Sequence, residues 1–313
     1  MVGQEAGRHS GQRGDWYRSS GVRAGNRRMF QRDMEEGRVF FPPDLVPHLA
    51  HEAVRELPAA RTRELTVRHL YQFLLSATQL ETRIVNRGAE WIAGNRVGFE
   101  VPRPSRLDAY RIYCDEGYHS LYSLDLADQI AAATGIPIPD WDYGGFVARV
   151  KETGRAALPG EPVLAHLLQV IVFETLITAV LNEVPTNPAV VTAVRDVTRD
   201  HARDEGRHHR FFAGFFHTLW AHLEPSLRTR VACAVPSLIR ACLVWDTAPV
   251  RSSLLLAGLD APTADAVLRD VYGGSAETRR IREVSQATLR MCESAGALDV
   301  PGAREAFALH GIE

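Results

Sequence analysis

The sequence is almost free of lysine, since Lys151 is the only one and the other basic residues are arginines. Its formal net charge is −2, which indicates neither a nucleic acid nor an anionic membrane as a partner. No apolar run approaches the roughly 20 residues that span a bilayer, and the N-terminus has no apolar signal region. These absences predict a cytoplasmic protein with no membrane or nucleic-acid partner.

Cysteine is also scarce, because the chain has four, all scattered and without Cys-x-x-Cys spacing. This argues against a thiolate zinc site and predicts free thiols in a reducing compartment. The sequence further lacks the alternating pattern of β-strands and the fingerprints of flavin-binding and nicotinamide-binding folds. The missing strand pattern predicts an all-α fold.

The 313 residues divide into two parts by composition. Residues 1–38 are rich in Gly, Ser and Arg and predict a disordered tail, whereas residues 39–313 predict a single domain. Helical periodicity predicts four long helices at the centre of this domain, over 61–95, 106–134, 162–182 and 189–223. Shorter flanking helices are predicted over 44–57, 226–245, 262–273 and 275–296.

One five-residue pattern occurs twice, since residues 115–119 and 204–208 both read Asp-Glu-Gly-x-His. On a helix, each copy places its Glu and His one turn apart on the same face. Two such pairs, together with one inward Glu from each of two further helices, bind two iron or manganese ions in helical bundles. Glu81 and Glu174, on the two helices that precede the copies, supply those carboxylates. The sequence therefore predicts a dinuclear metal site.

Glu174 lies in the middle of an apolar stretch, where a bare carboxylate is costly to bury. It must be paired, protonated or metal-bound, and a buried pair with an arginine is the alternative to a ligand. Glu81 has the same alternative, because Arg83 and Arg87 lie near it on the predicted helix. Four glutamates would balance the charge of two Fe(II) ions, and mixed carboxylate and imidazole ligands suit iron or manganese better than zinc.

Aspartates beside these motifs are candidates for the next layer of the site. Metal-bound imidazoles usually donate their other N–H to a carboxylate. Asp115 and Asp204 precede the Glu of each copy, and Asp125 lies further along the same predicted helix as Asp115. Each could accept a hydrogen bond from a ligand imidazole across the bundle, and the alternative is an ordinary surface aspartate.

The complete pattern resembles the ferritin-like diiron carboxylate proteins, and among them the arylamine N-oxygenases of the p-aminobenzoate N-oxygenase family. The resemblance covers roughly residues 60–215 and is most specific at His201, where this family has a seventh ligand one turn before the last Glu. It implies a ferritin-like bundle, a homodimer and two irons. One iron would be held by Glu81, Glu116 and His119. The other would be held by Glu174, His201, Glu205 and His208.

The resemblance also implies a reaction. Two Fe(II) ions would react with O₂ to give a peroxo-diferric species that oxidises an amine, aryl by resemblance, to a hydroxylamine and then a nitroso or nitro product. Such a monooxygenase belongs in secondary metabolism, including antibiotic biosynthesis. Electrons would come from an external donor of the ferredoxin or reductase type, because the chain has no fingerprint for a redox nucleotide.

The expected pocket wall departs from what a small aromatic acid needs. Phe73, Ser76, Ala77 and Ile177 offer neither a cation nor an amide for a substrate carboxylate. Arg279 or Arg280 could serve if the last predicted helix folds over the site. We therefore expect a larger or neutral amine rather than aminobenzoate.

Three other functions fit parts of the pattern. The ligands alone also suit a diiron C–H hydroxylase or desaturase. A radical-generating subunit of ribonucleotide reductase would need a redox tyrosine, and Tyr122 follows His119 by three residues, although a core tyrosine explains it as well. The third alternative is a non-enzymatic protein that binds iron or assembles through its helices.

Overall fold

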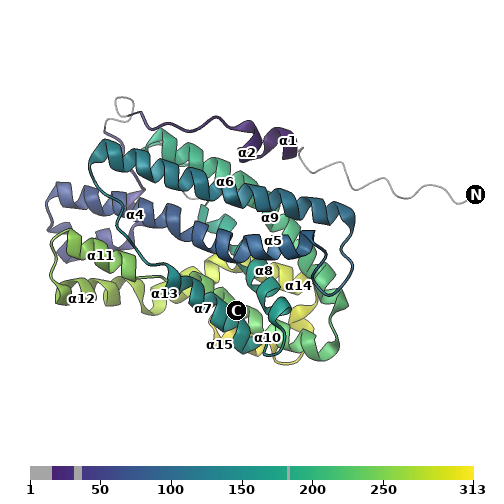
Figure 1. The fold of residues 1–313 in the computed structure, drawn as a ribbon. Helices are drawn as coiled ribbons and strands as arrows, with labels where there is room; N and C mark the ends of the chain where they lie inside the picture. The colour runs from purple at the N-terminus through teal and green to yellow at the C-terminus, as the bar shows by residue number, and fades with distance from the viewer. Residues whose placement is uncertain (1–15, 32–36, 182–183) are drawn as a thin grey trace, which may run out of the picture.

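The structure is a computed structural model that describes residues 16–31, 37–181 and 184–313, and its regular elements are helices (Figure 1). Within these residues the only β pairing is an isolated bridge between Val39 and Val190. The all-α, ferritin-like class is therefore confirmed. The central helices are α4 (Ala59–Leu80), α5 (Asn86–Ala93), α6 (Arg103–Thr134), α8 (Pro162–Leu181) and α9 (Thr192–His222).

The central helices form two pairs. Helix α5 packs most closely on α6, helix α8 packs most closely on α9, and α6 and α9 join the pairs. The predicted helix over 61–95 is not continuous, because five residues of π-helix, η4 (Glu81–Val85), separate α4 from α5. An inserted π-turn rotates the side chains that follow it, and such turns are frequent at functional sites. Glu81 is the first residue of this turn.

The flanking helices cover one end and one side of this bundle. They are α7 (Gly144–Ala157), α10 (Pro225–Leu243), α11 (Ala248–Leu256), α12 (Ala261–Tyr272), α13 (Gly274–Val284), α14 (Gln286–Ser294) and α15 (Ala303–Leu309). The predicted helix over 275–296 is two helices that meet at Ser285. The predicted helix over 44–57 is mostly 3₁₀ turns with one short helix, α3 (Glu52–Arg55), because Pro47 cannot donate the hydrogen bond that a continuous helix requires.

The described part of the predicted tail is structured rather than disordered. Helices α1 (Trp16–Ser19) and α2 (Gly21–Ala24) lie along α6 and α9 (Figure 1). Two arginines of this segment pair with acids of the bundle. Arg27 Nη2 lies 2.6 Å from Asp125 Oδ1, and Arg28 Nη2 lies 2.7 Å from Asp200 Oδ2. Residues 1–15 and 32–36 lie outside the described residues.

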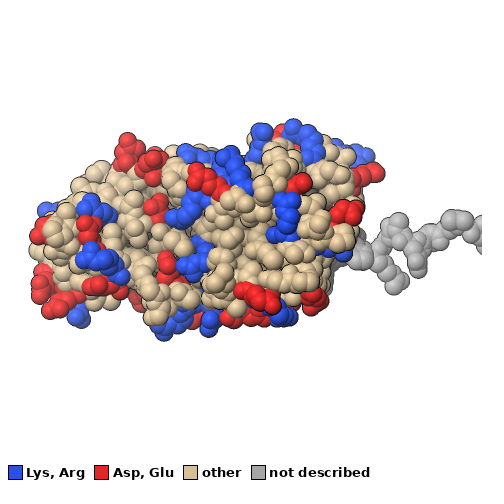
Figure 2. Space-filling model, turned by 90° about the horizontal axis from the view of Figure 1, so that it is seen from below, with Lys and Arg blue, Asp and Glu red and all other residues tan. Residues whose placement is uncertain are grey.

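Two helical segments, Pro162–Ala179 and Pro225–Leu256, are long and apolar enough to cross a membrane by length and composition. The expectation that no apolar run approaches this length is therefore corrected. The first segment is 72% buried within the fold and the second 50%, and the core helix of a globular protein passes the same test. Helix α8 is apolar on every side because α7, α9 and α10 pack around it. On the face shown in Figure 2, basic and acidic side chains are interspersed.

Candidate metal centre

Seven predicted ligands converge in the middle of the central helices. All are buried, and the most accessible of them is only 4% exposed. The π-turn η4 contributes one, helix α6 two, helix α8 one and helix α9 three. They are Glu81, Glu116, His119, Glu174, His201, Glu205 and His208.

Their donor atoms form two groups, in each of which all the atoms lie within 4.8 Å of one another. Glu205 belongs to both groups. Its Oε1 lies 3.3 Å from Nδ1 of His119 and 3.3 Å from Nδ1 of His208, so one oxygen faces both positions. The first group is Glu81, His119, His201 and Glu205. The second group is Glu116, Glu174, Glu205 and His208.

This grouping corrects the expected partition of the ligands. The sequence pattern places His201 with Glu174, whereas the structure places His201 Nε2 3.2 Å from Glu81 Oε1. His201 lies one turn before Glu205 on α9 and His208 one turn after it, so the two imidazoles flank Glu205, and the neighbouring elements decide which glutamates each of them meets. Glu116 also joins the other group, because its Oε1 lies 2.9 Å from His208 Nδ1.

Glu116 nevertheless faces both positions, as Glu205 does. Its second oxygen, Oε2, lies 3.1 Å from Nδ1 of His119, the imidazole one turn further along α6. The arrangement therefore offers two carboxylates between the groups, one from each copy of the repeated motif. Neither the spacing nor the composition of the sequence could identify them as the shared pair.

Most of these donor atoms have no hydrogen-bond partner among the described residues. Both oxygens of Glu81, Glu174 and Glu205 are buried with no hydrogen-bond partner among the described residues, as are His201 Nε2 and His208 Nδ1. His201 Nε2 and Glu81 Oε1 are close, yet their contact lacks hydrogen-bond geometry. Atoms that approach this closely without bonding each other are directed at a shared point. The negative charge of buried carboxylates must be balanced by a nearby positive charge. Carboxylate and imidazole ligands suit iron or manganese, so the residues fit a dinuclear metal site.

Without metal, the imidazoles carry the compensating charge. Burial and the charge of Glu205 raise the pKa of Glu174 well above its usual value. Burial lowers the pKa of His119 and His208, but hydrogen bonds and charges from the carboxylates around them outweigh it, and both pKa values lie well above the usual one. Metal cations would replace these protons, so metal binding should weaken as the pH falls.

The two motif aspartates support the imidazoles across the bundle. His119 Nε2 lies 3.4 Å from Oδ2 of Asp204, and His208 Nε2 lies 3.2 Å from Oδ2 of Asp115. Each copy of the motif thus supplies the aspartate for the histidine of the other copy. Because Nε2 must carry the proton in these hydrogen bonds, Nδ1 is the ring nitrogen left to face the metal position.

Asp125 does not take the role expected for it. It lies six residues beyond His119 on α6, roughly 9 Å further along the axis. There its carboxylate accepts hydrogen bonds from Arg27 and from Gln129 Nε2, the latter at 2.9 Å. Its function is to anchor the N-terminal segment on α6.

Tyr122 lies directly beside the first group. Its ring centroid is 5.5 Å from that of His119 and 5.9 Å from that of His201. The phenolic oxygen is buried and has no hydrogen-bond partner among the described residues. Burial, followed by the charge of Glu81, raises its pKa well above the usual value, so the phenol stays protonated. The tyrosine is thus placed close to the metal positions, as the radical alternative requires.

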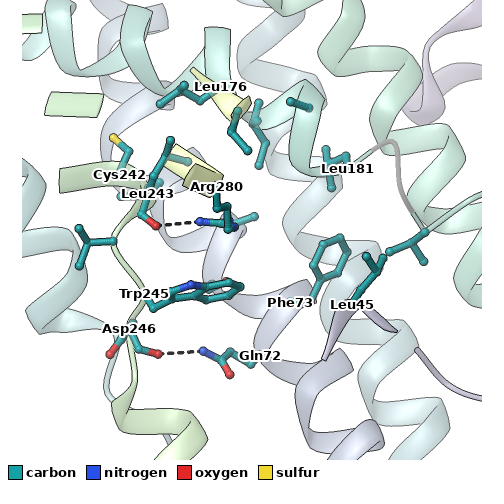
Figure 3. Close-up of a pocket in the computed structure, with 18 of the residues that line it drawn as sticks. Leu45, Gln72, Phe73, Leu176, Leu181, Cys242, Leu243, Trp245, Asp246 and Arg280 are labelled. Carbon is teal, nitrogen blue, oxygen red and sulfur yellow. Dashed lines mark hydrogen bonds between the residues drawn. The ribbon is translucent and has the colours of Figure 1, made fainter. Parts of the chain in front are cut away.

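A cavity of about 460 Å³ (Figure 3) is lined by residues one helical turn from two of the ligands, since Ala77 lies one turn before Glu81 and Ile177 one turn after Glu174. The residues next to these two glutamates in sequence, Leu80 and Phe173, form part of its wall. The expected wall residues Phe73, Ser76, Ala77 and Ile177 also line it. This size suits a small aromatic molecule, and such pockets are usually apolar with a few polar groups.

The far end of this cavity carries the polar groups. Arg280 reaches it from α13, where its Nη1 donates to the carbonyl of Leu243 at 3.0 Å and its guanidinium lies 4.2 Å from the centre of the Trp245 ring. Gln72 Nε2 donates to the carbonyl of Asp246 at 3.0 Å (Figure 3). Arg280 is therefore the arginine that folds over the site, and Arg279 is not among the lining residues.

The sequence pattern does not predict two of these groups, Gln72 and Trp245. Gln72 lies one turn before Ser76 on α4, so extending the expected pocket face by one turn would have found it. Trp245 follows the end of α10 in a loop, and no periodicity indicates where a loop residue points. The acidic side chains of Asp44 and Glu283 also line the cavity, and they come from segments distant from the motifs.

A comparison with protein families finds one match over most of the chain. The family described as P-aminobenzoate N-oxygenase AurF matches residues 27–296, a wider range than the motifs alone cover. The match includes all seven converging side chains and every residue that lines the cavity, whereas Trp16 and Gly21 precede it. No curated protein matches the chain.

Proposed function

The chain belongs to the p-aminobenzoate N-oxygenase family, whose members are non-haem diiron enzymes, and we propose that it oxygenates the nitrogen of an arylamine. The observation that carries this proposal is the pair of buried ligand groups that share Glu205. Two metal ions held by these groups would supply the O₂ activation that amino-acid side chains cannot provide alone. The products would be a hydroxylamine and then a nitroso or nitro compound.

We assign the seven side chains to two irons. Glu81, His119 and His201 would hold the first iron, Glu174 and His208 would hold the second, and the remaining two glutamates would lie between them. Asp204 and Asp115 would orient the imidazoles. Iron is preferred to manganese because of the family's chemistry, and the iron pair would supply O₂ activation when bound.

The protein's own residues would bind the amine and keep it neutral. Only an unprotonated amine has a free lone pair to oxidise, and the wall nearest the glutamates is apolar, with Ala77, Leu80, Phe173 and Ile177. An apolar wall disfavours the charged ammonium form. The same wall excludes bulk water from the metal positions.

The substrate proposed here is a neutral or larger arylamine without a carboxylate. Three acidic residues, Asp44, Asp246 and Glu283, are among the residues that line the cavity, and their charge would disfavour a carboxylate. Among the described residues, Arg280 is the one Lys or Arg that lines it, and its guanidinium already donates to a carbonyl and covers an aromatic ring. Turnover of p-aminobenzoate as fast as that of its amide would contradict this preference.

A diiron oxygenase also needs an electron donor. Reduction of the irons needs electrons from a separate ferredoxin or reductase, since the sequence has no fingerprint for a flavin or nicotinamide. A cytoplasmic location remains part of the proposal, as does a place in secondary metabolism. The overall charge of −2 supports no nucleic-acid partner.

We propose a homodimer that forms through the exposed face of α6. Apolar and small residues follow one another there at alternating spacings of three and four, the heptad pattern of paired helices. They are Leu107, Tyr110, Cys114, Gly117, Leu121 and Leu124. The pattern reads the same in both directions, so it can pair with itself in an antiparallel arrangement that also sets Arg103 opposite Asp128 of a second copy.

Light scattering tests this interface directly. Leu121, which is 63% exposed, should contribute strongly to the pair, so Leu121→Glu is expected to give a monomer. Leu309→Glu changes an even more exposed leucine, 85% accessible, on the distant helix α15 and should leave the dimer intact. A monomeric wild-type protein, or a dimer that survives Leu121→Glu, would contradict the proposed interface.

The enzymatic proposal is tested by a single turnover. Protein loaded with Fe(II) without oxygen is mixed with ¹⁸O₂ and an arylamine, and the products are analysed by mass spectrometry. We expect ¹⁸O on nitrogen, and we expect none with Glu174→Gln, which removes an anionic ligand while keeping the shape. Oxygen on carbon would instead indicate a C–H hydroxylase, and iron binding without any product would indicate a non-enzymatic role.

A further inference from the structure

Residues 16–31, called the N-terminal strap below, run along the seam between α6 and α9 (Figure 1). Successive residues of the strap contact successive turns of α6. Trp16 bonds Asp115, Arg27 pairs with Asp125, and the backbone N–H of Phe30 donates to the Gln129 side chain at 2.9 Å. The contacts span roughly 20 Å of the helix.

Two of the strap's hydrogen bonds end on the aspartates that support the metal site. Trp16 Nε1 donates to Asp115 Oδ2 at 2.8 Å, and this same oxygen accepts the bond from His208. The backbone N–H of Gly21 donates to Asp204 Oδ2 at 3.0 Å, the oxygen that accepts the bond from His119. The strap therefore touches the same two atoms that hold the two ligand imidazoles.

The two aspartates differ in how else they are held. Asp204 also pairs through its other oxygen with Arg207, three residues along α9. Asp115 is buried, and its Oδ1 has no hydrogen-bond partner among the described residues. Apart from its bond to His208, Asp115 therefore depends on Trp16, and this dependence makes it the more sensitive of the two.

We propose that the N-terminal strap positions the metal ligands, with Trp16 acting through Asp115 on His208 and Gly21 acting through Asp204 on His119. This inference rests on the proposed iron centre. Each bond fixes the rotamer of an aspartate, which in turn fixes the orientation of an imidazole ring. Because the two relays end at different metal positions, each should affect one iron.

The expected size follows from the number of steps in each relay. Loss of a carboxylate bonded directly to a ligand imidazole typically lowers metal affinity about 10- to 100-fold. Trp16 lies one bond further out, so we expect Trp16→Phe to release iron about 3- to 10-fold faster. Phenylalanine keeps the aromatic packing against Tyr17 and removes only the indole N–H.

The experiment measures how quickly Fe(II), loaded without oxygen, passes from the protein to a chelator. Wild-type protein should hold about two irons per chain. Trp16→Phe should accelerate the release of one of them, while the thermal unfolding of the metal-free protein stays unchanged. In an Asp115→Asn background, Trp16→Phe should add nothing further, because the relay is already broken.

Gly21→Ala tests the second relay. A Cβ at this position would lie 2.9 Å from Asp204 Oδ2, so the carboxylate must move. The variant should accelerate the release of the other iron, and the double variant with Trp16→Phe should affect both. Arg27→Gln is the matched control, since it loosens the strap at Asp125 without touching either relay.

The outcomes separate this inference from the proposed function. Wild-type protein that binds no iron would contradict the proposed function itself. Two bound irons whose release is unaltered by Trp16→Phe and Gly21→Ala would overturn only the role of the strap. The same would follow if Trp16→Phe accelerated release equally with and without Asp115→Asn, because its effect would then not pass through that carboxylate.

Discussion

Replacement of Glu174 by leucine should stabilise the metal-free protein while it destroys the metal site. Glu174 is fully buried, its two oxygens have no hydrogen-bond partner among the described residues, and it lies between Phe173 and Thr175 on the most apolar helix. A carboxyl group in this place loses its hydration and gains no hydrogen bond, only the attraction of His208 Nδ1 at 3.8 Å. Leucine has a similar volume and no polar group.

The magnitude follows from measured replacements of buried charged groups by apolar residues. These are often neutral or stabilising by about 1–4 kcal/mol. We expect about 1–3 kcal/mol for Glu174→Leu, because burial and the charge of Glu205 disfavour the charged form of this carboxyl and raise its pKa. At about 2–4 °C per kcal/mol, the unfolding temperature should rise by several degrees.

The assay compares thermal unfolding with and without Fe(II) in the absence of oxygen. Metal that binds only the folded state stabilises it, so wild-type protein should become the more stable of the two once iron is present. Gln169→Leu is a control on the same helix, because the Gln169 amide donates to the carbonyl of Lys151 at 3.3 Å and its removal brings no such gain. A metal-free Glu174→Leu variant less stable than wild type would refute the reasoning.

Three further predictions concern other parts of the molecule. Burial lowers the pKa of His48 to about 4 and of His69 to about 3, so both imidazoles stay neutral in the folded state at a pH where the unfolded state takes up protons. Each histidine should therefore lower the free energy of unfolding by about 2 kcal/mol between pH 7 and pH 5. His69→Leu should weaken this pH dependence, as measured by urea unfolding. Gly88→Ala places a Cβ 2.6 Å from Val170 Cγ2 where α5 meets α8. Denaturant unfolding should show that the free energy of unfolding falls by about 1–3 kcal/mol, and an unchanged value would show that the two helices can move apart without cost. Ala77→Phe places a large side chain in the cavity, so arylamine turnover should fall at least 10-fold while the iron content stays at about two per chain. Loss of iron would instead show that Ala77 supports the ligands.

Much of the metal site could be predicted from the sequence because helices have a fixed geometry. The spacing of Glu116 and His119, and of Glu205 and His208, places each pair on one face regardless of what surrounds it. The partition of ligands between the two positions could not be predicted, because it depends on how α6 and α9 cross. His201 shows this, since its nearest glutamate outside α9 comes from η4 rather than from α8.

The fold, too, could be predicted from the sequence only in part. Long periodic segments predict the central helices, but the π-turn at Glu81 has no signal in the hydrophobic pattern. The composition of the strap, polar and rich in arginine, predicts a disordered tail. That composition is also what pairs it with Asp125 and Asp200 on the bundle surface, and only the arrangement of α6 and α9 brings those acids together.

The central claim is that two buried metal positions share Glu205, and the anomalous diffraction of iron in crystals of the Fe(II)-loaded protein tests it most directly. We predict two iron peaks in each chain. One should lie within bonding distance of Glu81, His119 and His201, and the other within bonding distance of Glu174 and His208. A single peak, no peak, or an iron bound by both His201 and Glu174 would contradict it.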